Sequence, residues 1–408
     1  MHGTRRASHW LGWAVAAWLC QPSHQQARPQ RWPALKAREW MEAQEWRLGA
    51  NYLPSRSSNV LQMFEVSTFN ETLLVMGKEL AVARAVGFTA MRIFLHEHLY
   101  FTQGEKFLEN VDRALSAVDE NGMVAIVVLF DACWRPDVEG ADAIPGVHNS
   151  AWVQCPSHAL LRSFAEGEDA ATQRLEKYVT EVVGHFRTDP RIAVWDIYNE
   201  ASMRDSEHWI LPRLVMTLGL EGYPDHWLLD GKKVEATYKL LTSSFAWARS
   251  MQPVQPLTTA IWDYPTTSDP NEVVEWKVSF NQALLDASDV LSLHCYCTPE
   301  ELNARLSELA NLRRGPAMVT EFMARTRNST LQESLPVLRS HGAWGFTWGL
   351  FNGMSQTHRP WSTWMTNEVP EEAEWFHDVF HSNGTAYSQD EVMSVWWHTT
   401  GVKLTTEL

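Results

Sequence analysis

Strand-like and helix-like segments alternate along almost the whole chain, and this alternation limits the possible folds more than any other feature of the sequence. The segment MVAIVVLF at 123–130 is a nearly continuous apolar run, as expected for a parallel strand buried on both faces. Strands that alternate with helices indicate a parallel α/β fold, and eight such strands indicate a closed barrel. The predicted strands cover 47–53, 89–95, 123–130, 192–198, 257–262, 290–296, 317–322 and 343–350.

Helix-like segments lie between most of these strands and after the last one. No internal repeat, low-complexity tract or linker divides the chain, and α/β barrels often use about 250 residues or more as one domain. We therefore predict a single-domain (β/α)8 TIM barrel. The predicted helices cover 71–86, 105–120, 170–186, 233–250, 299–312, 331–340 and 389–399.

Charge and aromatic content narrow the kind of partner. The 408 residues include 34 Lys and Arg against 49 Asp and Glu, which gives a formal charge of −15. This balance argues against a nucleic-acid partner, because phosphate binding needs a basic face. The 21 tryptophans exceed what one core needs, and indole rings are favoured platforms for the apolar C–H faces of sugars.

The N-terminal residues have the pattern of a secretory signal. Arg5 and Arg6 precede an apolar run at 10–20, which the polar stretch QPSHQQARPQ follows. No stretch reaches the roughly 18 to 20 apolar residues of a membrane span, so we expect no stable membrane insertion. We predict a signal peptide at 1–27, a catalytic domain at 28–408 and a secreted protein, with an uncleaved N-terminal anchor as the alternative.

Two glutamates stand at the ends of predicted strands, Glu200 after the fourth and Glu321 in the seventh. In a barrel, the residues that act on a substrate lie at the C-terminal ends of the strands. Glycoside hydrolysis needs two such carboxyl groups: one protonates the leaving oxygen, and the other attacks the sugar or activates water. Further polar or aromatic residues at strand ends are Asn51, Arg92, His96, Asp131, Asn199, Trp262, Asp263, His294, Tyr296 and Trp348.

The segments around both glutamates resemble those of clan A glycoside hydrolases. WDIYNE at 195–200 is similar to their Asn-Glu acid/base motif, and MVTEF at 318–322 is similar to the strand that carries their nucleophile. WGLFNGMSQTHRPW at 348–361 and the tail EWFHDVFHSNGTAYSQDE extend the likeness over residues 32–402. The chain thus resembles the family 5 group of cellulase-like endo-β-1,4-glycanases and xylanases.

The resemblance implies the roles of the two carboxyl groups. Glu200 matches the general acid/base, Glu321 the nucleophile, and Asn199 the residue that hydrogen-bonds the sugar 2-hydroxyl. Two positions depart from the family pattern. Ala201 stands where a proline usually follows the Asn-Glu pair, and strand three ends in Asp131-Ala-Cys-Trp rather than in histidine.

Four more residues are implied to support the reaction. Arg92 and Tyr296 match the groups that hold the nucleophile ionised and aimed. His294 matches the histidine that lines the cleft, and Trp348 matches the aromatic floor beneath the cleaved sugar. Any of these residues could instead be structural, as part of an ion pair or of ordinary barrel packing.

Simple physical rules add two expectations for the carboxyl groups. Arg92 should lower the pKa of Glu321, while drier surroundings should raise that of Glu200. Strict strand alternation puts Asn199 and Glu200 on opposite faces, so both can reach the cleft only if the strand ends or bulges there.

The cysteines leave two pairings open. Cys133 and Cys155 are close enough in the sequence for a loop disulfide, with two free buried thiols as the alternative. Cys295 and Cys297 should share the face of strand six that is turned toward the helices.

We predict no metal or other cofactor. His96 and His98 share a strand face, but zinc needs a third or fourth ligand, and the sequence offers no such pattern.

The expected protein is a secreted, monomeric, retaining glycoside hydrolase that acts on a β-linked polysaccharide or oligosaccharide of the endo-β-1,4-glucan or xylan type. A mannanase or β-glucosidase specificity on the same barrel is an alternative. A catalytically silent carbohydrate-binding barrel is the rival from another functional class.

Overall fold

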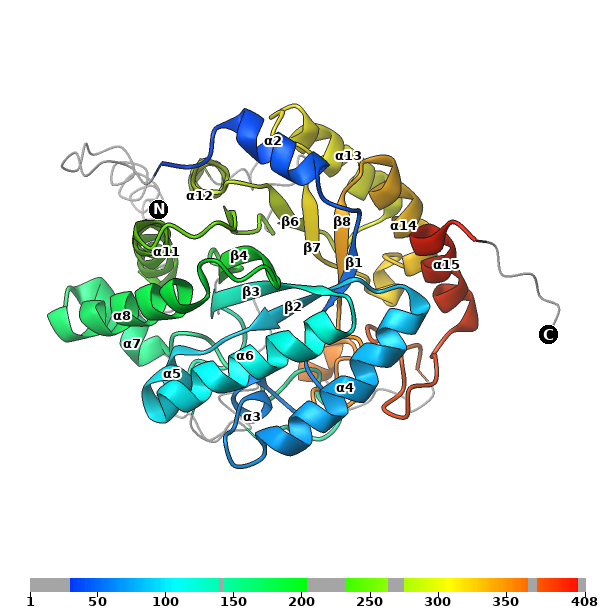
Figure 1. The fold of residues 1–408 in the computed structure, drawn as a ribbon, viewed down its shortest axis with the longest axis horizontal. Coiled ribbons are helices and arrows are strands. Elements are labelled where there is room, and N and C mark those ends of the chain that lie inside the picture. Colours follow the sequence, from blue (N-terminus) through cyan, green and yellow to red (C-terminus); the bar gives the residue numbers. More distant parts are fainter. Residues whose placement is uncertain (1–29, 139–141, 204–231, 263–274, 366–372, 403–408) are drawn as a thin grey trace, which may run out of the picture.

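Eight parallel β-strands form the centre of the protein, and helices surround them (Figure 1). The computed structural model describes residues 30–138, 142–203, 232–262, 275–365 and 373–402. The predicted signal peptide at 1–27 therefore lies outside the described residues. The strands are β1 Leu48–Asn51, β2 Ala90–Phe94, β3 Val124–Asp131, β4 Ile192–Asn199, β5 Leu257–Thr258, β6 Ser292–His294, β7 Met318–Phe322 and β8 Trp344–Trp348.

The order of the strands closes the sheet on itself almost completely. Neighbours follow the order β5-β4-β3-β2-β1-β8-β7-β6, with parallel pairing throughout. At the seam between β5 and β6, Ile261 forms a parallel bridge with Leu293. Its N–H donates to the Ser292 carbonyl at 3.1 Å, and its own carbonyl accepts from the His294 N–H at 2.8 Å. The predicted (β/α)8 barrel is confirmed.

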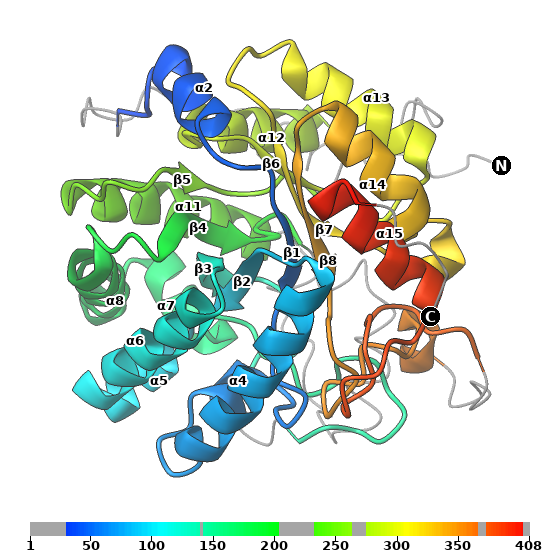
Figure 2. The ribbon, with the colours of Figure 1, turned by 45° about the vertical axis from the view of Figure 1, so that its right-hand side comes forward.

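Seven helices lie where the sequence predicts them, with ends that agree to within two residues. The structure adds α12 between β5 and β6, where the sequence analysis placed no helix. Helices α13, α14 and α15 lie side by side on one flank of the barrel (Figure 2). The barrel helices are α4 Phe69–Val86, α6 Glu105–Glu120, α8 Asp169–Phe186, α11 Lys232–Ser250, α12 Glu275–Ala287, α13 Pro299–Ala310, α14 Leu331–Ser340 and α15 Gln389–Thr400.

Shorter helices occupy the connections and the segment before β1. None of the helices in the described part of the chain has the length and apolar character that a membrane span requires. The additional helices are α2 Ala34–Glu42, α3 Val60–Met63, α5 Glu97–Gln103, α7 His158–Glu166, and the 3₁₀ turns η2 Arg325–Arg327 and η3 Trp361–Trp364.

Apolar side chains fill the barrel toward the N-terminal ends of the strands. Ile126, Val194 and Phe346 belong to one buried cluster there. Gly49 makes this packing possible, because a Cβ at this position would lie 2.4 Å from the Phe346 ring and 2.6 Å from the Ala90 carbonyl oxygen. The filled lower half leaves the C-terminal ends of the strands for polar side chains.

A buried ion pair attaches the C-terminal helix to the barrel. Arg325, in the turn η2 after β7, donates to both carboxylate oxygens of Glu391 in α15, at 2.7 and 2.6 Å. The same guanidinium donates to the main-chain carbonyls of Trp375, His377 and Asp378. The tail after β8 thus folds around one buried cation.

Replacing Glu391 by alanine should destabilise the protein by about 3 to 5 kcal/mol, because Arg325 would remain buried without its counter-charge. Chemical denaturation of the two proteins measures the difference. Glu109→Ala, which removes an exposed partner of Lys106, is the matched control and should cost about 1 kcal/mol or less. If Glu391→Ala destabilised the protein as little as Glu109→Ala does, Glu391 would not be the counter-charge that stabilises buried Arg325.

Candidate active site

A cavity of about 220 Å³ lies at the C-terminal ends of the strands. Glu200 directly after β4, Glu321 in β7 and Trp348 at the end of β8 all line it. The structure therefore brings three residues that are far apart in the sequence into one cleft. The other lining residues are Cys133, Trp134, His148, Asn199, Met203, Trp262, Tyr296, Arg327, Trp361 and Trp364.

The guanidinium of Arg92 organises the floor of this cleft. Arg92, in β2, is fully buried. Its Nη1 donates to Asn51 Oδ1 at 2.6 Å and to Glu321 Oε1 at 3.0 Å. Its Nη2 donates to Asp196 Oδ2 at 2.8 Å and to Asn199 Oδ1 at 2.7 Å. One side chain thus joins the ends of β1, β4 and β7.

Glu321 accepts two hydrogen bonds that favour its ionised form. Besides Arg92, the Tyr296 hydroxyl donates to Oε2 at 2.8 Å. Burial nevertheless raises the pKa of Glu321 to about 7, and the nearby Glu200 adds to this rise, while His294, Arg92 and Tyr296 act to lower it. The sequence-based expectation was right about the effect of Arg92 and wrong about the net direction, because desolvation outweighs the guanidinium.

Glu200 reaches the cleft because β4 ends immediately before it. Strand β4 stops at Asn199, and Glu200 has a left-handed backbone with φ of 48°. This turn breaks the strand alternation, so Asn199 and Glu200 both line the cavity. The strand ends where the sequence analysis required an end or a bulge.

Two neutral groups contact the Glu200 carboxyl. His294 Nδ1 lies 2.8 Å from Oε1, and the Cys133 thiol donates to Oε2 at 3.2 Å. Burial lowers the pKa of His294 to about 4 and raises that of Cys133 well above its ordinary value. At neutral pH the imidazole is therefore uncharged and the thiol keeps its proton. These two contacts of Glu200 are thus with neutral groups, whereas Glu321 contacts the cationic Arg92.

Asn199 has a defined amide orientation. Its Oδ1 accepts from Arg92, and its Nδ2 donates to Asp131 Oδ1 at 3.2 Å. Asp131 is held in turn by the Trp152 indole N–H, which donates at 2.6 Å, and by the main-chain N–H of Cys133 at 2.8 Å. The residue that departs from the family pattern at the end of strand three therefore orients Asn199.

Tryptophan and tyrosine side chains form a large part of the cavity wall. Trp348 is 7% exposed and makes edge-to-face contacts with Phe94 and Trp152, with ring centroids 5.9 and 5.5 Å apart. Trp134 and Trp364 stack on each other with centroids 5.2 Å apart. These contacts hold several indole rings rigidly around the two glutamates.

Sequence reasoning missed several residues of the site. Asp196 bonds Arg92 and stands inside the WDIYNE segment, so its place in that motif was a usable signal. No sequence signal marked Cys133 or Arg327 as part of the site. Cys133 lies in the loop after β3, and Arg327 lies in the turn η2. Of the two residues expected at the end of strand five, Trp262 lines the cavity, and Asp263 lies outside the described residues.

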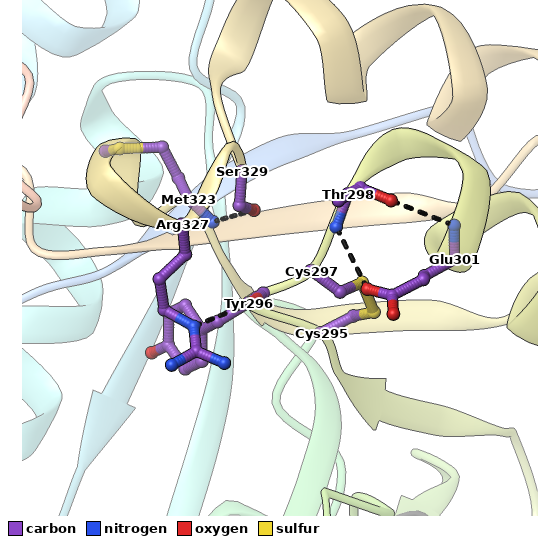
Figure 3. The surroundings of a disulfide bond; sticks show 8 residues. All are labelled: Cys295, Tyr296, Cys297, Thr298, Glu301, Met323, Arg327 and Ser329. Atoms are coloured by element: carbon purple, nitrogen blue, oxygen red, sulfur yellow. Dashed lines mark hydrogen bonds between the residues drawn. A yellow bond between two sulfur atoms is a disulfide. The ribbon is translucent and has the colours of Figure 1, made fainter. Parts of the chain in front are cut away.

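The structure also decides the cysteine alternatives. Cys133 and Cys155 are free, buried thiols. Cys295 and Cys297 form a disulfide with a Cα–Cα distance of 5.1 Å (Figure 3). The sequence analysis expected both cysteines on one face of strand six, but β6 ends at His294, so both lie beyond the strand.

One group in the described part of the chain has a geometry that a metal ion could use. Ligand atoms of Glu200, His294 and Glu321 lie within 4.8 Å of one another. Both Glu321 oxygens already accept hydrogen bonds, one of them from the cationic Arg92. A guanidinium at this distance repels a second cation, so the group suits proton transfer better than metal binding. His96 is instead buried, with Nε2 2.9 Å from the Gln154 carbonyl oxygen.

No family model and no curated protein sequence matches this chain. Solved structures do match it in fold. β-Glucosidase 1317 aligns with a TM-score of 0.58 and 12% identity, covering 88% of this chain and 99% of its own. GH5_18 from Streptomyces cattleya, solved with GlcNAc, aligns with a TM-score of 0.55 and 13% identity, covering 88% and 82%. The β-1,4-D-mannanase from Cryptopygus antarcticus aligns with a TM-score of 0.52 and 13% identity, covering 88% of this chain and 93% of its own. At these identities the likeness establishes a barrel fold shared with glycoside hydrolases.

Proposed function

We propose that this protein is a retaining glycoside hydrolase that cleaves β-linked polysaccharide or oligosaccharide. The observation that carries the proposal is the pair of buried carboxyl groups with different partners. Glu200 and Glu321 each have an oxygen within 4.8 Å of the other, which is compatible with the spacing of about 5 to 5.5 Å in retaining enzymes. Inverting enzymes hold the two groups about 6.5 Å or more apart to admit a water molecule.

The different partners of the two glutamates support different roles. The nearby carboxyl groups disfavour double ionisation, so they hold one proton between them around neutral pH. Arg92 and Tyr296 stabilise negative charge on Glu321, whereas Glu200 contacts a neutral imidazole and a thiol. Arg92 and Tyr296 thus favour Glu321 as the ionised group, which attacks the anomeric carbon, and Glu200 carries the proton that goes to the leaving oxygen. Water then hydrolyses the glycosyl-enzyme with Glu200 as base.

The cavity walls support a sugar as the substrate. Trp348 lines the same cavity as both carboxyl groups and can place its ring under a pyranose, while Asn199 can hydrogen-bond the 2-hydroxyl. We propose the endo-β-1,4-glucan or xylan type as the substrate class. Mannan and short β-glucosides are the second candidates, because structures with the same fold are named as a β-mannanase and a β-glucosidase. A screen of the purified protein on β-glucan, xylan, mannan and aryl β-glycosides separates these specificities and also tests for a silent binding protein.

We also propose that the protein is secreted, as the pattern at 1–27 predicts. The Cys295–Cys297 disulfide supports this, because such bonds persist mainly in oxidising compartments. N-terminal sequencing of the protein recovered from the medium of a secretory host tests the proposal, and an intact cytosolic chain would contradict it.

Glu321→Gln and Glu200→Gln should fail in different ways. Glu321→Gln should abolish turnover on every substrate and form no covalent adduct with a 2-fluoro glycoside in a mass spectrum. Glu200→Gln should lose about 10²- to 10⁴-fold on substrates with poor leaving groups, because those need acid assistance. It should lose far less on a dinitrophenyl glycoside. Equal losses of Glu200→Gln on both substrate types would be inconsistent with the acid role.

The pH dependence of kcat/KM should report the ionisation of Glu321. Activity should fall as the pH drops through about 7, where Glu321 gains its proton. In Tyr296→Phe a donor to the carboxylate is lost, so the pKa rises and the acidic limb should move to higher pH, with a loss of about 10- to 100-fold at neutral pH. An acidic limb unchanged in Tyr296→Phe would argue against this assignment.

Trp348→Ala should lower kcat/KM by about 30- to 150-fold, or roughly 2 to 3 kcal/mol, with much of the loss in kcat. The reason is that the indole face favours the positive charge that develops on the sugar ring. Melting temperature and active-site-titrated kcat should be measured on one sample. A destabilised variant with unchanged kcat would show that Trp348 only fills space.

A further inference from the structure

A disulfide brackets the tyrosine that orients the proposed nucleophile. Cys295 and Cys297 are bonded to each other, and Tyr296 lies between them (Figure 3). Two extended residues would separate the cysteine Cα atoms by about 6.6 to 7.2 Å, whereas the observed distance is 5.1 Å. The bond therefore holds the main chain in a turned conformation at Tyr296, directly after the end of β6.

Other contacts restrain the same short segment from both sides. The N–H of Cys295 donates to the Glu321 carbonyl at 2.9 Å, which continues the pairing of β6 with β7. After Cys297, Thr298 and Glu301 form a capping box that begins α13. The Arg327 Nε donates to the Tyr296 carbonyl at 3.2 Å (Figure 3). The disulfide thus lies in the stretch that connects β6 to α13. Strand β6 pairs with β7, which carries Glu321.

The Tyr296 side chain projects away from the disulfide and into the site. Its hydroxyl donates to Glu321 Oε2 at 2.8 Å, and its ring meets Trp361 edge-on with centroids 5.2 Å apart. A hydrogen bond at this distance depends on a hydroxyl position defined to a few tenths of an ångström. The main-chain conformation at Tyr296 sets the direction of the ring, and the disulfide limits that conformation.

We propose that the Cys295–Cys297 disulfide is a positioning element of the active site, so that turnover depends on its redox state. A dithiol supplies two electrons and two protons, which convert the bond to two thiols while the dithiol itself becomes a disulfide. The segment then gains conformational freedom, and the Tyr296 hydroxyl spends less time on Glu321. The kinetic consequence depends on the proposed glycosidase function; the effect on the ionisation of Glu321 does not.

The kinetic test compares the full-length protein before and after treatment with dithiothreitol, with opening of the bond verified by thiol alkylation and mass spectrometry. We expect kcat to fall by about 10-fold with little change in KM, and the acidic limb of the pH profile to move to higher pH. Without reductant, the double variant Cys295→Ala/Cys297→Ala should show the same kcat and pH profile as the dithiothreitol-treated wild-type protein. Dithiothreitol should leave this variant unchanged, which controls for effects of the reagent elsewhere.

Tyr296→Phe decides whether the disulfide acts through the tyrosine. If it does, removing both cysteines from Tyr296→Phe should change kcat by less than about twofold, although the same change in the wild type costs about 10-fold. Additive losses would mean that the disulfide supports the fold rather than Tyr296, and would overturn the proposal. A full-activity protein with the bond open would overturn it as well.

A measurement without substrate separates this proposal from the proposed function. Glutamate labelled with ¹³C at the carboxyl carbon reports the titration of Glu321, whose signal is assigned by its loss in Glu321→Gln. Opening the disulfide should raise the pKa of Glu321, because a hydrogen bond to the carboxylate is weakened. This shift without any glycosidase activity would reject the function and retain the positioning role. An unchanged titration in an active enzyme would reject the positioning role alone.

Discussion

The buried guanidinium of Arg92 is the interaction on which the upper half of the barrel depends. It is fully buried between the carboxylates of Asp196 and Glu321, and it also bonds Asn51 and Asn199. Removing Arg92 would leave the carboxylates of Asp196 and Glu321 buried together without a counter-charge, which costs several kcal/mol. The strand ends are therefore held in register by charge neutralisation, while the lower half is held by apolar packing around Phe346.

This arrangement also gives the two carboxyl groups different properties. Both carboxyl groups are buried, and burial disfavours the ionised form of a carboxyl group. Glu321 has the cation and the tyrosine hydroxyl as partners, and Glu200 has an uncharged histidine and a thiol. A pair whose environments differ in this way can divide acid and nucleophile roles at one pH. In the proposed mechanism this division arises from the neighbours, since the two side chains are chemically identical.

Function in such a barrel resides in the loops and strand ends rather than in the scaffold. The scaffold is shared with β-glucosidase and β-mannanase structures at 12 to 13% identity. Several features shape the surroundings of the cavity in this chain: Asp131 and Cys133 at the end of strand three, the stacked Trp134 and Trp364, and the Cys295–Cys297 bond beside Tyr296. These are the positions at which its activity can differ from that of proteins with the same fold.

The sequence by itself determined the barrel, because strand and helix patterns are local and each strand is marked by its own apolar run. It also indicated both glutamates and Arg92, since strand ends converge in this fold and the flanking motifs are contiguous. Only the tertiary structure decided the free thiols of Cys133 and Cys155, the Cys295–Cys297 bond and the net rise in the pKa of Glu321. The free thiols and the pKa depend on how distant segments meet and on the depth of burial, and the bond depends on the turned main chain at Tyr296. A linear pattern specifies which residues reach the cleft, but the balance between desolvation and the charge of Arg92 exists only once the chain has closed around them.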